Sequence, residues 1–114
     1  MSDDINIHPA ARDELHDTIR HYAAIDDLDD DEREPLALAF HNTFYRYVDA
    51  IIANPLRFSV RKPPTRRVNL TPRFGAYYIA YMIWRDKPVI LAVAHGKRRP
   101  YYWRKRVGEA RRMF

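Results

Sequence analysis

Apolar residues in the first part of the chain recur at helical spacing. Between Pro9 and Ala23 they occupy every third or fourth position: Ala11, Leu15, Ile19, Tyr22 and Ala23. This spacing predicts an amphipathic helix with one buried face. Upstream, Ile5 and Ile7 alternate with polar residues and predict a short strand that ends before His8-Pro9.

A second and bulkier helical stripe runs from Pro35 to Asn54-Pro55. Its apolar members are Leu36, Phe40, Phe44, Tyr47, Val48, Ile51 and Ile52. A stripe of this size cannot face water, so the predicted helix lies against a sheet, against the first helix, or against both as an antiparallel hairpin. The acidic run from Asp26 to Glu34 breaks the periodicity and is expected to connect the two helices.

The second half of the chain changes to the period of strands. Residues 66–70 alternate basic and apolar side chains, residues 76–84 are β-branched and aromatic, and residues 89–95 form another apolar run. Arg85-Asp86-Lys87-Pro88 reads as a turn, so an antiparallel meander is expected. Alternation in the middle strand places Tyr77 and Tyr78 on opposite faces, and both faces need cover.

These elements predict an α+β fold in a single domain over residues 1–114. The order is a strand, an antiparallel helical hairpin, three strands, and a short terminal helix or tail over residues 101–114, with the helices on one face of an antiparallel sheet. A length of 114 residues suits one core. The absence of cysteine, of a secretory signal and of a long apolar run favours a cytoplasmic protein.

Charge is distributed unevenly along the chain. Residues 1–56 contain four Arg and thirteen Asp or Glu, a net −9, whereas residues 57–114 contain sixteen Lys or Arg and two carboxylates, a net +14. A half-chain this basic predicts a surface that attracts polyanions or an acidic protein. Residues 97–106 combine cations with Tyr101, Tyr102 and Trp103, which suits phosphates and stacked bases. The alternative is a solvated basic tail whose rings fold back onto the core.

No catalytic set is obvious in the sequence. Neither Ser2 nor Ser59 lies in a Gly-x-Ser-x-Gly turn, and the five histidines lie in different predicted elements, so no metal site is expected. His95, at the end of a strand, is the best single candidate for proton transfer, although a histidine there also serves to fix the turn by hydrogen bonding. The other four histidines, including His8, are expected on the surface or in the hairpin.

Three segments resemble the RelE/ParE superfamily of bacterial type II toxins, often described as plasmid stabilisation proteins. They are residues 7–15 (IHPAARDEL), residues 73–81 (RFGAYYIAY) and residues 93–103 (VAHGKRRPYYW). The resemblance covers nearly the whole chain and implies the same strand, helical hairpin and sheet. It also implies either cleavage of messenger RNA in the ribosomal A site, as by RelE, or inhibition of DNA gyrase, as by ParE, with a cognate antitoxin and no cofactor.

The nuclease residues of the superfamily are matched only in part. Arg98 stands where these nucleases keep a phosphate-stabilising arginine, but Tyr78 replaces a second arginine, and Asn69 and Thr71 lie near the positions of two lysines. Tyr101, Tyr102 or Trp103 stands near the position of a catalytic tyrosine. If the protein is a metal-independent endoribonuclease, the resemblance and the chemistry of the side chains indicate three catalytic residues: His95, Arg98 and Tyr102.

The closing motif is more similar to the ParE branch. We therefore expect a toxin that acts on DNA gyrase and is neutralised by an antitoxin; the alternatives are a RelE-like ribosome-dependent endoribonuclease and an inactive binding module of the same fold. A homodimer and a toxin–antitoxin hetero-oligomer both stay open, and no membrane partner is expected. The residues expected to bind the target are Arg66, Arg67, Arg73, Tyr78, Lys97, Arg98, Arg99, Tyr101 and Trp103.

Overall fold

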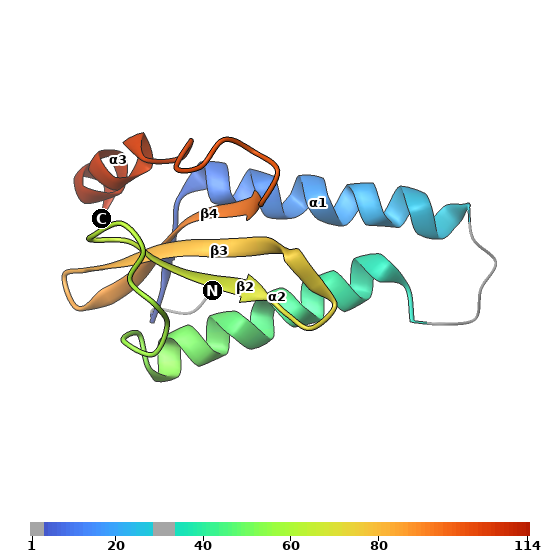
Figure 1. The fold of residues 1–114 in the computed structure, drawn as a ribbon, viewed down its shortest axis with the longest axis horizontal. Helices are drawn as coiled ribbons and strands as arrows, with labels where there is room; N and C mark the ends of the chain where they lie inside the picture. The colour runs from blue at the N-terminus through green and yellow to red at the C-terminus, as the bar shows by residue number, and fades with distance from the viewer. Residues whose placement is uncertain (1–3, 29–33) are drawn as a thin grey trace.

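The protein folds as a four-stranded sheet with a helical hairpin on one face and a short helix on the other (Figure 1). The computed structural model describes residues 4–28 and 34–114. The α+β class and the order of elements predicted from the periodicity are confirmed. The elements are β1 (Asn6–Ile7), α1 (Pro9–Asp27), α2 (Leu36–Ala53), β2 (Arg66–Leu70), β3 (Phe74–Trp84), β4 (Lys87–His95) and α3 (Lys105–Met113).

The strand order is β1-β4-β3-β2. The pairs β2–β3 and β3–β4 are antiparallel, which confirms the meander. The expectation of a purely antiparallel sheet is wrong in one pairing, because β1 runs parallel to β4, with Asn6 opposite Val89 and Ile7 opposite Ile90. β1 leads directly into α1, and α1 packs along β4, so this short strand lies at the outer edge of β4.

The two faces of β3 pack against different partners. Ile79 and Tyr81 join the core formed with the helical hairpin, where Phe40 and Phe44 are fully buried. The other face, which begins with Tyr78, packs against the chain that follows β4, including α3. The expectation that all helices lie on one face is therefore wrong: the second face is apolar as well, and α3 covers part of it.

β4 contains a β-bulge in its pairing with β3. Ala80 pairs with Ala92 and Tyr81 pairs with Ile90, so Leu91 is an extra residue on β4. As a result, Leu91 and Ala92 both pack in the second core, on the same face of the sheet. β1 ends opposite Ile90, and side chains bind the backbone of β4 beyond that point, as described below.

The acidic run after α1 is only partly a connector. α1 continues through Asp27, so Asp26 is helical and not in the loop. Its carboxylate accepts hydrogen bonds from the backbone N–H of Leu36 (2.8 Å) and of Ala37 (3.0 Å), the first residues of α2. A carboxylate at this position accepts hydrogen bonds from two otherwise free N–H groups of α2. Its negative charge also interacts favourably with the positive N-terminal end of the α2 dipole. Residues 29–33 of the run lie outside the described residues.

His8 is a buried structural residue that caps the first helix of the hairpin, so of the two expected places, the surface and the hairpin, it occupies the second. It is 5% exposed, and its Nδ1 accepts a hydrogen bond from Ala10 N (3.0 Å), which caps α1. Its Nε2 lies 2.8 Å from Glu109 Oε1 on α3. Pro9 removes one free N–H at the start of α1, and His8 supplies an acceptor for the next one.

Among the helices of the described residues, none is long and apolar enough to cross a membrane.

Tyr22, which packs against the core, should make the fold less stable at alkaline pH. Burial, with Tyr77 beside it, raises the pKa of Tyr22 from 10.0 to about 12. The neutral phenol stabilises the fold below the unfolded pKa of about 10, and this contribution is lost as the pH rises through the folded pKa. We expect Tyr22→Phe to lose less stability than the parent chain between about pH 10 and pH 12, measured by urea denaturation. Equal losses in both chains would contradict this assignment, and Tyr45→Phe, at an exposed tyrosine, is the control.

Candidate functional site

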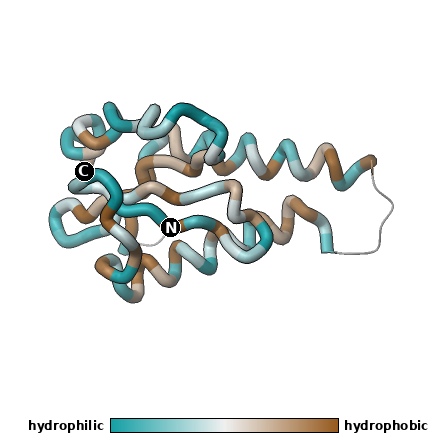
Figure 2. The backbone as a smooth tube through the Cα atoms, in the orientation of Figure 1, coloured by the Kyte–Doolittle hydropathy of each residue, from teal (hydrophilic) through white to brown (hydrophobic). Residues whose placement is uncertain are grey.

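The chain after β4 folds back over the second face of the sheet. Gly96 begins this return: its N–H donates to Ala76 O at 2.7 Å, and a Cβ at this position would lie 3.3 Å from the same oxygen, a tight contact that glycine avoids. Figure 2 shows the following loop as one of the most hydrophilic stretches of the backbone. The returning segment ends at Trp103, whose side chain is buried at 4% exposure. Its Nε1 donates a hydrogen bond to the Tyr78 hydroxyl at 3.1 Å. At Trp103, the alternative in which an aromatic ring packs on the core is therefore confirmed.

A basic groove lies between this returning segment and the loop before β2. Thr65 and Pro100 belong to its walls, and the other lining residues are cations and aromatic rings: Arg61, Arg66, Arg67, Tyr78, Tyr101 and Trp103. Cations also contact the rings. The Arg67 guanidinium carbon lies 3.8 Å from the centre of the Tyr78 ring, and Lys62 Nζ lies 4.9 Å from that of Tyr101.

Two further hollows, each of about 250 Å³, adjoin the basic groove. One is lined by Lys62, Pro63, Pro64, Thr65, Tyr101, Trp103, Arg104 and Val107, and the other by Arg99, Pro100, Tyr101, Tyr102, Arg104 and Lys105. Tyr101 lines all three depressions, so its side chain stands where they meet. Of the residues that line them, all within the described part of the chain, none is Asp or Glu.

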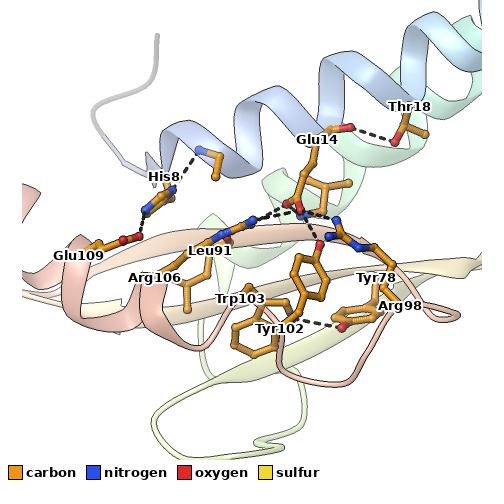
Figure 3. A network of polar contacts seen from close by, with 12 residues as sticks. His8, Glu14, Thr18, Tyr78, Leu91, Arg98, Tyr102, Trp103, Arg106 and Glu109 are labelled. Atoms are coloured by element: carbon orange, nitrogen blue, oxygen red, sulfur yellow. Dashed lines mark hydrogen bonds and ion pairs between the residues drawn. The ribbon is translucent and has the colours of Figure 1, made fainter.

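A second group of functional candidates is held by one carboxylate, Glu14 on α1 (Figure 3). Arg106 Nη1 donates to Glu14 Oε1 at 2.7 Å, Arg106 Nη2 donates to Oε2 at 3.2 Å, and Arg98 Nη1 lies 3.4 Å from Oε2. The Tyr102 hydroxyl donates to the same Oε2. We call Glu14, Arg98, Tyr102 and Arg106 the Glu14 cluster; only Arg98 has a largely exposed side chain, at 57%.

The Glu14 cluster also completes the bulged edge of β4. Val93 N donates to Glu14 Oε1 at 3.1 Å, and Leu91 O accepts from Arg106 Nη1 at 3.0 Å. These backbone groups lie beyond the point where β1 pairs with β4, so side chains replace the missing strand. The cluster thereby ties the C-terminal segment to α1 and to the sheet edge.

The Tyr102 phenol is poorly suited to act as a base near neutral pH. Burial, and then the hydrogen bond and charge of Glu14, raise the pKa of Tyr102 well above its ordinary value of 10.0, although Arg98 and Arg106 act in the opposite direction. The hydroxyl therefore keeps its proton and donates a hydrogen bond to Glu14. Arg98 stacks on the same ring, with its guanidinium carbon 3.8 Å from the ring centre.

His95 lies apart from the other two candidate catalytic residues. Its ring meets Tyr77 edge-on at 4.8 Å, on the face of the sheet that carries the helical hairpin, whereas Tyr102 packs with the second core. Its Nδ1 accepts a hydrogen bond from Lys97 N at 3.0 Å. The contacts described here thus give His95 the turn-fixing role, and the structure brings together Arg98 and Tyr102 but does not add His95 to them.

Some of the remaining candidate residues have structural contacts, and others lie exposed on the surface. Arg66 donates from Nη1 to Phe58 O (2.8 Å) and Leu56 O (3.2 Å), so it holds the preceding loop in place. Arg73 lies at the β2–β3 turn, 4.0 Å from Glu34. Lys97 and Arg99 are exposed on the loop after β4. Tyr78 is 3% exposed. Its ring packs under the Arg67 guanidinium, and its hydroxyl accepts the hydrogen bond of Trp103.

Sequence reasoning missed the residues whose importance depends on the fold. Glu14 was one of several carboxylates on the first helix, and nothing in its spacing distinguishes it. Arg61 and Lys62 were not singled out either, and they line the depressions around Tyr101 from a segment about forty positions before Arg104. The one available signal was the shared basic character of these two segments. Within the described residues, no three His, Asp or Glu side chains come together as a set of metal ligands.

Comparison with known proteins adds no assignment at this point, since neither a protein-family model nor a curated protein matches the chain.

Proposed function

We propose that the protein is the toxin of a type II toxin–antitoxin pair of the RelE/ParE superfamily, and that it acts by binding DNA gyrase, as ParE toxins do. The three sequence segments that resemble this superfamily support the proposal. The α+β fold supports it as well, since the helical hairpin and the meander are what the resemblance implies. Fold alone does not specify function, so the argument depends on the site.

The Glu14 cluster is the observation that favours a toxin that inhibits by binding over one that acts by catalysis. Its carboxylate engages Arg98, Arg106 and the Tyr102 hydroxyl together. Phosphodiester cleavage needs a base, an acid and accessible cations around one reacting group. Here the phenol keeps its proton, two guanidinium groups pair with a carboxylate, and His95 faces the hairpin side of the sheet.

Exposed cations of the C-terminal half provide the means of binding. Arg99, Arg104 and Lys105 are exposed beside the ring of Tyr101. Such a patch accelerates encounter with an acidic or polyanionic surface and penalises a partner of the same charge. An acidic or amphipathic antitoxin that covers the same surface would prevent the encounter, which is the neutralisation that the proposal requires.

This function is tested by expressing the chain with and without a candidate antitoxin gene and by measuring gyrase supercoiling and translation separately. We expect growth arrest in cells. In the assay with purified proteins we expect loss of supercoiling, and added salt should relieve it. Arg99→Glu with Lys105→Glu should weaken inhibition by at least about tenfold, because like charges at an interface cost several kcal/mol. Arg20→Glu, on the exposed side of α1, is the matched control. Intact supercoiling together with cut messenger RNA would contradict the proposal.

A ribosome-dependent endoribonuclease is the second candidate, favoured by one observation. The side chain of Arg98 is 57% exposed and lies on the Tyr102 ring, so a cation remains accessible next to a phenol. In that case Arg98→Ala should lower the cleavage rate about 10²-fold or more while leaving binding nearly unchanged. Undiminished cleavage by this variant would reject the nuclease role of Arg98. Normal growth on expression of folded protein would favour an inactive binding module over both toxins.

A further inference from the structure

The outer side of α2 carries a line of apolar residues that the described part of the chain leaves largely uncovered. Leu38 and Tyr45 are 49% and 40% exposed, and Ile52, which is half-buried, continues the line. These residues are seven positions apart, so they lie on one side of the helix, away from the buried Phe40 and Ile51. Single exposed apolar residues are common, but a line of them along one helix suits contact with another protein surface.

Two polar residues lie on the same line, one on each side of Tyr45. His41 comes four positions before Tyr45 and Asp49 four positions after it, and both are exposed. The His41 ring contacts the Tyr45 ring, with centres 4.8 Å apart. Within the described part of the chain, Asp49 forms no ion pair. At 3.6 residues per turn, all these side chains fall within about 40° of Tyr45 around the helix axis. We call them the α2 stripe: Leu38, His41, Tyr45, Asp49 and Ile52.

The α2 stripe is symmetric about Tyr45. In either direction along the helix, a polar residue follows after four positions and an aliphatic residue after seven. A two-fold axis requires this order, because an antiparallel copy places each residue opposite the one that is equally far beyond the axis. With the axis at Tyr45, Leu38 faces Ile52 of the second copy. In the same arrangement His41, a hydrogen-bond donor, faces the carboxylate of Asp49 of the second copy.

We propose that the α2 stripe binds the α2 stripe of a second copy of this chain, in an antiparallel dimer with two-fold symmetry. Repetition at seven positions favours a shallow crossing of about 20°, which keeps the two helices in contact along the ~21 Å between Leu38 and Ile52. The stripe is small beside the roughly 20 to 30 residues a side of a standard interface, so the dimer is expected to be weak.

The dimer does not involve the surface on which the proposed function depends. α2 belongs to the hairpin on one face of the sheet (Figure 1), whereas the depressions around Tyr101 include Tyr78 and Trp103 of the second core, on the other face. Each copy in the dimer therefore keeps its own cationic surface. The inference stands or fails independently of gyrase as the target.

Dimerisation is measured by sedimentation equilibrium of the full chain from about 1 to 300 μM, where a micromolar association changes the average mass from one chain towards two. Tyr45→Glu places two carboxylates face to face on the axis and should weaken the dimer at least about tenfold. Because Tyr45 is exposed, the thermal midpoint should change little. Lys105→Gln is the matched control: it lowers the charge by the same amount on α3, across the sheet, and should leave the dimer unchanged.

A charge exchange between His41 and Asp49 tests the pairing itself. His41→Asp puts a carboxylate opposite Asp49 of the second copy, twice in each dimer, and should weaken association at least about tenfold. Adding Asp49→Lys to this variant restores opposite charges and should recover most of the lost affinity. Positions 41 and 49 lie about 12 Å apart along the helix axis, so the rescue cannot arise within one helix.

Three results would overturn the inference. The first is a parent chain that stays monomeric up to about 300 μM, since even a weak dimer forms at that concentration. The second is a dimer that Tyr45→Glu does not weaken, which would place the contact elsewhere. The third is a His41→Asp variant that Asp49→Lys fails to rescue, which would reject the antiparallel pairing. The supercoiling assay is read separately, because neither His41 nor Asp49 belongs to the cationic surface.

Discussion

Replacing Glu14 by alanine is expected to lower the free energy of unfolding by about 3 to 5 kcal/mol, the range for breaking a buried ion pair from one side. The substitution leaves the Arg106 guanidinium, with 16% of its side chain exposed, without its carboxylate, and it removes the acceptor of the Val93 N–H. Both losses occur at the edge of β4 that no strand covers. The measurement is urea denaturation at neutral pH.

Two neighbours of Glu14 provide matched controls. Arg98→Ala removes the exposed member of the Glu14 cluster and should cost at most about 1 kcal/mol, as exposed ion pairs do. Asp13→Ala removes a carboxylate from the exposed face of the same helix and should change stability by about 0.5 kcal/mol or less. A loss for Glu14→Ala no larger than these two would show that the cluster does not hold the C-terminal segment.

Replacing Phe40 by alanine should cost about 3 to 5 kcal/mol, as for large aromatic residues in well-packed cores. Phe40 on α2 is 0% exposed, and its ring meets Phe74 at 5.1 Å and Tyr77 at 5.2 Å in edge-to-face geometry. Its removal leaves a cavity between the hairpin and β3 that rigid neighbours cannot fill. Tyr45→Ala, on the exposed side of α2, is the control; a similar loss in both variants would contradict this account of the core.

The uneven charge of the sequence becomes a surface only in part. Seven of the sixteen cations after residue 56 line the depressions around Tyr101. Others serve the fold: Arg98 and Arg106 bind Glu14, and Arg85 and Arg111 lie 5.5 and 5.4 Å from the Trp84 ring. Basic composition was therefore a sound guide to a cationic surface and a poor guide to which cation belongs to it.

The helices, the three main strands and the two-faced character of β3 were determined by the sequence itself. Their signal is local: apolar residues at steps of three or four, or at alternate positions, must share a face whatever the rest of the chain does. The strand end at His95 was visible in the same way. These features follow from short-range geometry, and the structure confirmed them.

Only the tertiary structure decided which face α3 covers, that β1 runs parallel to β4, and that Glu14 joins Val93, Arg98 and Arg106. The bonds from Glu14 span 79 to 92 positions of sequence, and contacts of this range leave no periodic pattern behind. The same holds for Arg61 and Tyr101, which line one groove from distant segments. Local spacing specifies a face of an element, whereas a site requires the packing of several elements together, and packing depends on the whole chain.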